Sequence, residues 1–212
     1  MDDVPRVEID LPIDELNGSP SQRKRTHARV TDAASAFAAE RFEDARGLLK
    51  PIAAQQTHIA EIRELYGLTL YRLGRWAEAI SELEAASMLT GSSDQHPVRA
   101  DAHRALGHHD AVERLWDELR HDHPDPEIIT EGRIVYAGSL ADRGELASAI
   151  RVLEQGPVRT KVPKDHHLRL WYALADLYER SGDTQRARRG FERIAGAEQD
   201  FGDVDARLRS LS

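Results

Sequence analysis

The histidines are the residues of this sequence that first suggest a chemical role, because histidine is a common metal ligand. The chain has 10 histidines and no cysteine, which excludes zinc–thiolate sites and a cysteine nucleophile. A zinc or nickel site needs three or four converging ligands, yet no HExxH motif and no His-x3-His pair occurs. We therefore predict no metal and no cofactor. A histidine-based metal sensor remains an alternative, and its clustered candidate ligands are His96, His103, His108, His109, His121 and His123.

Other catalytic patterns are also missing from the sequence. There is no G-x-S-x-G, no P-loop and no G-x-G-x-x-G. Glu61 and Glu64 are spaced like acids on an ordinary exposed helix face. We predict that the protein is not an enzyme.

The charge balance also limits the classes of partner. With 29 Lys+Arg against 37 Asp+Glu, the net charge is −8, which argues against nonspecific nucleic-acid binding, and the basic triplet at residues 23–25 supplies few phosphate contacts. The first residues are acidic where a signal peptide is basic, and no apolar run approaches the roughly 18 to 20 residues of a membrane span. We predict a cytoplasmic protein with no nucleic-acid or membrane partner.

An internal repeat determines the fold prediction. Five segments each carry a small residue followed four positions later by a large apolar one, and the small residues are 34, 32, 38 and 38 positions apart. In four segments a second small residue lies twelve positions earlier. The five small residues are Ala45, Ala79, Ala111, Ala149 and Ala187, and their large partners are Leu49, Leu83, Leu115, Leu153 and Phe191.

The clearest unit, at residues 61–87, predicts the structure of all of them. Apolar residues recur at helical spacing on both sides of Gly74, which breaks the helix. Each unit is therefore expected to be a helix, a tight turn and a second helix. Small residues such as Gly67 and Ala79 would let the two helices approach closely.

These units resemble the tetratricopeptide repeat (TPR) family, whose pattern is a 34-residue helix-turn-helix with small residues near the middle of both helices. The resemblance covers residues 26–195 and implies an all-α, right-handed TPR solenoid of about five helix-turn-helix units. Glu40 stands at a turn where the family prefers Gly, and Arg99 takes a small position, so the first helix of the third unit is expected to be short, roughly 97–106. The composition also resembles that of TPR proteins of high-GC actinobacteria, many of which have no assigned activity.

Two segments lie outside the repeats. Residues 1–25 are predicted to be an extended or disordered lead-in, in which the alternating Val7, Ile9, Leu11 and Ile13 would pack along the first unit. Residues 196–212 are predicted to be a cap, with a short helix that begins at Asp203 and covers the last unit.

The resemblance also implies a concave groove lined by one face of each first helix. The clamp by which some TPR domains hold chaperone tails needs Asn and Lys in that groove, and Asn17, the single Asn of the chain, lies outside the repeats. Arginine forks could still hold carboxylates there. The candidate partner-binding residues are Phe37, Glu64, Leu68, Tyr71, Arg72, His103, Arg104, Arg169, Tyr172 and Asp176.

We therefore predict a non-enzymatic scaffold or adaptor that binds a peptide segment or a helix of a partner protein in the groove. The inference from fold to binding is an analogy, because repeat folds carry many functions. The alternative is a structural subunit that self-associates as a homo-oligomer, with the groove closed by its own N-terminal segment.

Overall fold

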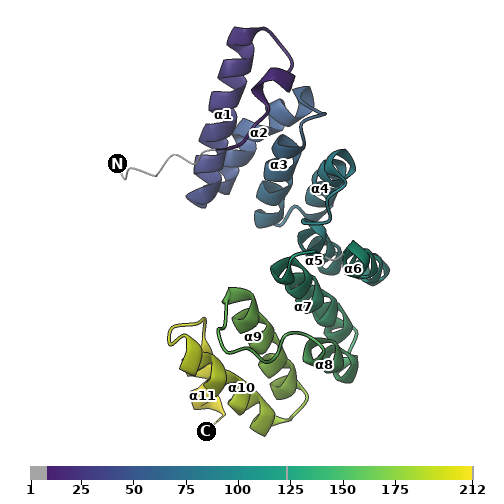
Figure 1. The fold of residues 1–212 in the computed structure, drawn as a ribbon, viewed down its shortest axis with the longest axis vertical. Helices are drawn as coiled ribbons and strands as arrows, with labels where there is room; N and C mark the ends of the chain where they lie inside the picture. The colour runs from purple at the N-terminus through teal and green to yellow at the C-terminus, as the bar shows by residue number, and fades with distance from the viewer. Residues whose placement is uncertain (1–8, 123, 212) are drawn as a thin grey trace. The chain divides into compact units, whose positions relative to one another are not determined.

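The computed structural model describes residues 9–122 and 124–211, so Val7 and His123 lie outside the described residues. Within those ranges the chain forms eleven α-helices, one 3-10 helix and no strand, which confirms the all-α prediction. Figure 1 shows the arrangement of the helices within each part of the chain. The chain divides into two compact units, residues 1–107 (unit 1) and 108–212 (unit 2).

Unit 1 is built from helices that pack in chain order. Helix α1 packs against α2, and α3 against α4, across short turns. The second helix of each pair also packs against the next first helix, and the first helices α1, α3 and α5 contact one another in succession. The bounds are η1 Ile13–Glu15, α1 Pro20–Ala38, α2 Phe42–Gln55, α3 Ala60–Arg72, α4 Trp76–Thr90 and α5 His96–Ala105.

Unit 2 repeats the same scheme. Helices α7 and α8 form one pair and α9 and α10 another, while α7 and α9 also contact each other. Helix α6 packs against α7, and α11 packs against α10. The bounds are α6 His109–Asp122, α7 Pro126–Asp142, α8 Leu146–Glu154, α9 Asp165–Arg180, α10 Thr184–Ala197 and α11 Val204–Ser210.

The turns inside the pairs share one backbone geometry. In the α3–α4 turn, the N–H of Gly74 donates to Tyr71 and that of Arg75 donates to Leu70, which satisfies the last carbonyls of α3. Gly74 has φ +70°, in the left-handed region that glycine adopts without steric cost. Glu40 takes the same place between α1 and α2 with φ +57°, and it is the only non-glycine with positive φ among the described residues.

The expected close approach of paired helices is present at Gly67. A Cβ atom there would lie 2.7 Å from Cγ of Leu83 on α4, so only glycine fits without movement. The expected short helix of the third unit is also present, because α5 has ten residues. Arg99 is buried on α5 at the position where a small residue was missing, and its Nη2 lies 3.5 Å from Oε1 of Glu84.

The N-terminal prediction needs a correction at its boundary. We expected an extended or disordered lead-in through residue 25, but α1 begins at Pro20. Ser19 caps the helix, since its side chain accepts from the backbone N–H of Gln22 while the Gln22 side chain accepts from the backbone N–H of Ser19. Proline at the first helical position is favoured as well, because its fixed φ suits the helix.

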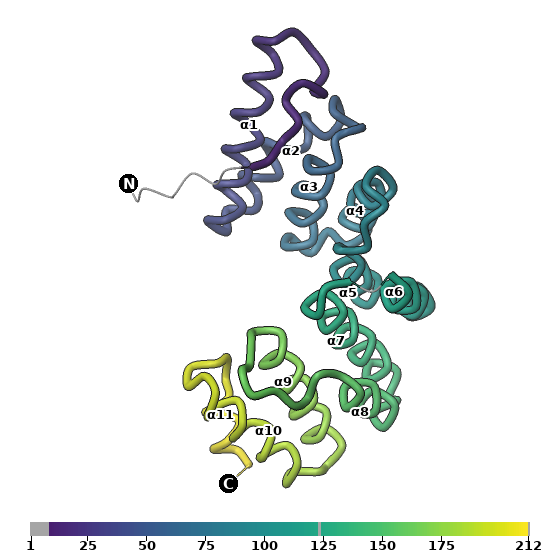
Figure 2. Tube along the Cα trace, in the orientation of Figure 1, coloured from purple at the N-terminus to yellow at the C-terminus, as the bar shows by residue number. Residues whose placement is uncertain are grey.

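Residues 9–18, which precede α1, pack into unit 1. Figure 2 traces this segment beside α1. Leu11 and Leu16 are buried in the hydrophobic cluster that contains Val30 of α1 and Ile62 of α3, and Ile9 packs against the same cluster. Ile13 is 38% exposed, so only part of the alternating apolar strip faces the cluster.

The C-terminal helix covers the end of unit 2, as expected. Helix α11 begins after Asp203, and Val204 is buried in the cluster formed by α9 and α10. Phe201, Leu208 and Leu211 pack against the same cluster. The cap therefore shields apolar side chains at the end of the α9–α10 pair.

Candidate functional site

The candidate residues of unit 1 centre on Tyr71 of α3. Its hydroxyl donates to Oδ2 of Asp101 on α5 at 2.6 Å, and Nε of Arg104 donates to Oδ1 of the same carboxylate at 2.9 Å. Burial, reinforced by the neighbouring Asp101 carboxylate, raises the pKa of Tyr71. Tyr71 and Arg104, both predicted from the sequence, are thus brought together by Asp101, which was not.

Leu68 lies between Glu64 and Tyr71 on one face of α3, because steps of four and three residues share a helix face. Leu68 is half-buried, and Oε1 of Glu64 accepts from Nε2 of Gln95 at 2.8 Å. Burial raises the pKa of Glu64, although the Gln95 hydrogen bond opposes that shift. This face of α3 therefore presents an apolar centre between two polar groups that bind residues at or beside α5.

Phe37 and Arg72 meet around the ring of Phe42 at the start of α2. The Phe37 and Phe42 rings pack edge to face with centroids 5.4 Å apart, and the Arg72 guanidinium lies 4.3 Å from the Phe42 centroid. Nη2 of Arg72 also lies 3.4 Å from Oε1 of Glu40. Phe37 therefore packs within the first helix pair, and Arg72 joins the first and second pairs. His103, the remaining candidate of unit 1, is half-buried on α5.

The candidate residues of unit 2 lie on α9. Arg169 pairs with Glu131 of α7, its Nη1 lying 3.3 Å from Oε1, and with Asp165 one turn earlier. The Tyr172 hydroxyl donates to Asp203 at the start of the C-terminal cap. Burial and the Asp203 carboxylate raise the pKa of Tyr172.

Asp176 is held by the cap through Arg207. Nη2 of Arg207 donates to Oδ1 of Asp176 at 2.8 Å and to Oε2 of Glu179 at 2.8 Å. Two of the three candidates on α9, Tyr172 and Asp176, are therefore bonded to the chain's own C-terminal segment. Their role in partner binding stays a prediction.

Sequence reasoning missed the residues that bind the candidates. Asp101, Asp203 and Arg207 were not among the predicted groove residues, since each comes from a neighbouring helix or its cap. One local signal was available: Asp203 and Arg207 are four residues apart, the spacing that places two side chains on the same side of a helix. Asp101 lies three residues before the candidate Arg104 on α5, a spacing that also places two side chains on one side of a helix.

The described residues contain neither a metal-binding cluster nor a membrane-spanning helix. No group of three or more His, Asp or Glu side chains there is arranged to hold a metal ion, and His123 lies outside the described residues. Within the same ranges, no helix has the length and apolar character needed to cross a membrane.

Comparison with solved structures identifies the fold. No protein-family model matches the sequence, and no curated protein matches it. Among solved structures, TTC0263, a thermophilic TPR protein of Thermus thermophilus, is 17% identical with a TM-score of 0.66, and the match covers 88% of this chain and 98% of that one. The protein has a TPR-like fold. The TPR-like solenoid expected from the repeats is thus confirmed, while the exact number of units stays a prediction.

Other solved structures share this fold. MamA of AMB-1 is 16% identical with a TM-score of 0.55, and the match covers 86% of this chain and 97% of MamA. The quorum sensor NprR of B. thuringiensis is 14% identical with a TM-score of 0.72 over 91% of this chain, which spans 58% of NprR. At these identities the similarity establishes the TPR-like fold alone.

Proposed function

We propose that this TPR-like protein is a non-enzymatic, cytoplasmic scaffold that binds a peptide segment or helix of a partner protein along its first helices. The observation that carries the proposal is the face of α3, where half-buried Leu68 lies between the polar groups of Glu64 and Tyr71. An apolar centre with a polar rim is the usual anatomy of a protein interface. YrrB, a TPR protein described as having an unusual peptide-binding site, has a TM-score of 0.50 to this chain.

A charge placed at the apolar centre tests this proposal. We would compare tagged intact protein with Leu68→Glu and with Met88→Glu, which adds the same charge on α4 at a side chain that is 79% exposed. Alanine substitutions at Tyr71 and Tyr172 are less suitable, because both hydroxyls bind carboxylates within the chain.

The expected result is a partner protein recovered with the intact chain and with Met88→Glu, but lost with Leu68→Glu, in pull-downs read by mass spectrometry. Far-UV circular dichroism and melting curves would show that both variants remain folded. Equal recovery with all three proteins would remove the α3 face as the binding surface.

One observation favours the alternative, a self-associating subunit whose groove is closed by its own N-terminal segment. Leu11 and Leu16 are buried in the cluster that includes Val30. Val30 lies seven residues before Phe37, so both are on the face of α1 that the TPR resemblance assigns to the groove. Deletion of residues 1–18 tests it and keeps the Ser19 cap of α1. The alternative predicts a changed mass by light scattering and a lower melting temperature, whereas unchanged values for both would contradict it.

A further inference from the structure

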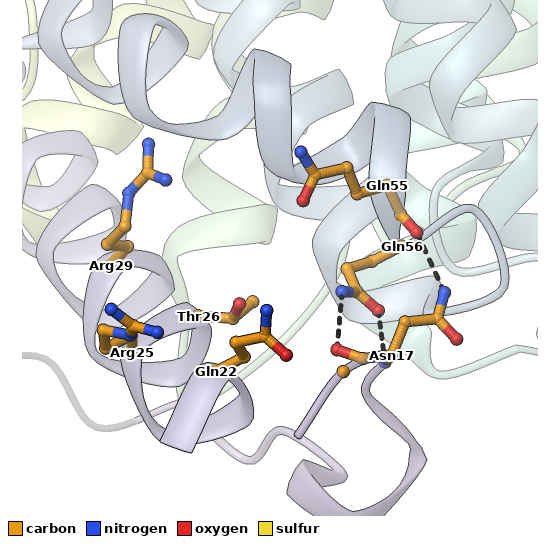
Figure 3. A pocket seen from close by; sticks show the side chains of 8 residues that line it. Asn17, Gln22, Arg25, Thr26, Arg29, Gln55 and Gln56 are labelled. Atoms are coloured by element: carbon orange, nitrogen blue, oxygen red, sulfur yellow. Dashed lines mark hydrogen bonds between the residues drawn. The ribbon is translucent and has the colours of Figure 1, made fainter. Parts of the chain in front are cut away.

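A polar pocket of about 420 Å³ opens in unit 1 between the N-terminal half of α1 and the end of α2. Figure 3 shows the side chains of α1 on one side of the opening, and those of Gln55, Gln56 and Asn17 on the other. Its size falls in the range of about 300 to 1,000 Å³ that is usual for ligand pockets. The lining residues contain two arginines and no acid.

The α1 wall carries two guanidinium groups one helical turn apart. Gln22, Arg25, Thr26 and Arg29 line it with steps of three, one and three residues, which share one helix face. Among the residues that the structure describes, none forms a hydrogen bond or ion pair with the side chain of Arg25 or Arg29. The cations of this pocket are therefore available to a ligand, although the chain as a whole has a net charge of −8.

The opposite wall is held by Asn17. Its backbone N–H donates to Oε1 of Gln56 at 2.8 Å, and its Nδ2 donates to the backbone carbonyl of Gln55 at 2.9 Å. Gln56 is 3% exposed, so its amide is a buried polar group satisfied by this contact. On the α1 side, Gln22 is held by the capping box with Ser19. A wall fixed in advance lowers the entropic cost of binding.

We propose that this pocket binds a carboxylate ligand, either a small dicarboxylic acid or the acidic side chains of a peptide. Each guanidinium group presents parallel N–H donors that match the two oxygens of a carboxylate. Thr26 and the Gln55 side chain supply neutral donors at the same opening. Phosphate sites usually draw on backbone N–H groups at a helix N-terminus, and here the Gln22 N–H is already bonded to Ser19.

The observations behind this site differ from those that support the scaffold, so the two proposals can fail separately. The probes are glutarate, the capped peptide acetyl-Gly-Glu-Gly-Glu-Gly-amide, and its Gln counterpart. Binding to the full-length protein would be measured by isothermal titration calorimetry at low salt, with inorganic phosphate as a further probe.

The test variant is Arg25→Gln with Arg29→Gln. Its matched control is Arg114→Gln with Arg189→Gln, which changes the net charge equally at two exposed arginines. Melting curves would show that both variants are folded. We expect glutarate or the Glu peptide to bind intact protein and the control alike, and to bind the Arg25/Arg29 variant at least about tenfold more weakly.

Binding of glutarate alone would identify a small acid as the source of the carboxylate, and binding of the Glu peptide alone would identify a protein segment. Three outcomes would overturn the proposal. They are no binding of either probe, equal weakening in the control variant, and binding of phosphate or the Gln peptide as tight as that of the carboxylates.

Discussion

Tyr71 joins two first helices of unit 1 through one hydrogen bond to a charged acceptor, Asp101. A buried or half-buried bond of this kind is worth more than one between neutral groups, because a lost donor leaves the carboxylate poorly solvated. The candidate face of α3 is therefore also part of the packing contact between α3 and α5. Substitutions that probe binding there must be separated from substitutions that loosen the fold.

Tyr71→Phe keeps the ring and removes only the donor to Asp101. We expect the free energy of unfolding to fall by about 1 to 2 kcal/mol. Urea unfolding of Tyr71→Phe, Asp101→Asn and the double variant would measure the coupling between the two residues. A coupling energy near zero would show that the bond is not formed in solution.

Glu64 gives a pH-dependent prediction. Burial raises its pKa, so the folded state favours the protonated form, and the stability that this group contributes is present below its ordinary pKa and lost as pH rises through the raised value. Glu64→Gln is therefore expected to be more stable than the intact protein at pH 7, by less than about 1 kcal/mol because solvent screens a half-exposed group.

The difference in stability between Glu64→Gln and the intact protein should shrink as the pH falls to about 4, where Glu64 is mostly protonated in both states. Urea unfolding at pH 4, 5.5 and 7 would measure it. Glu61→Gln, one turn earlier and exposed, removes only a neighbouring charge that raises the Glu64 pKa, and it should change stability less. A difference that grows toward pH 4 would contradict the sign of the shift.

At the scale of elements, the turn between α1 and α2 has a glutamate in a backbone conformation that favours glycine. Glu40 has φ +57° where the other pair turns carry glycine. A side chain in the left-handed region costs roughly 1 kcal/mol. Its ion pair with Arg72 is exposed and is expected to recover little of that cost.

Glu40→Gly is expected to stabilise the protein by up to about 1 kcal/mol, reduced somewhat because glycine also makes the unfolded chain more flexible. The reverse change, Gly74→Ala at φ +70°, should destabilise it by a similar amount. Thermal unfolding of both variants would test the pair. A stabilising Gly74→Ala would show that the α3–α4 turn does not require the left-handed conformation at this residue.

Paired helices pack closely only where a small residue faces the partner helix. Two helical glycines, one at such a contact and one facing open space, test this requirement. Gly67→Ala places a Cβ atom 2.7 Å from Leu83 Cγ, so we expect a loss of about 1 to 3 kcal/mol. Gly47 is also within a helix but has nothing within 4 Å of an added Cβ, so Gly47→Ala should gain about 0.5 to 1 kcal/mol from helix propensity. Urea unfolding would measure both changes, and the same sign for both would contradict the packing argument.

At the scale of the molecule, a chain of stacked helix pairs has no single core, and its terminal faces need covers. The apolar clusters run along each unit, and each end is covered by a non-repeat segment: residues 9–18 in unit 1 and α11 in unit 2. Stability in such arrays is a sum of intrinsic and nearest-neighbour contributions, so the effect of losing a cover should remain local.

A chain that ends after Glu198 tests this locality. It removes Val204 and the Arg207 contacts to Asp176 and Glu179, so we expect faster amide hydrogen exchange in α9 and α10 and unchanged exchange in α1 and α2. Exchange would be read by mass spectrometry on the truncated and full-length chains. Equal acceleration in α1 would indicate that the array unfolds as one cooperative body.

The sequence by itself determined the helix pairs, their turns and the short α5, because the spacing of small and large residues is a local pattern that recurs through the chain. The start of α1 at Pro20 could also have been predicted from Ser19 and Gln22, which form a capping box. Only the tertiary structure showed that Tyr71 binds Asp101 and that Arg207 binds Asp176, at separations of 30 and 31 residues. These contacts depend on the angle at which neighbouring helices pack, and no residue spacing within one helix encodes that angle.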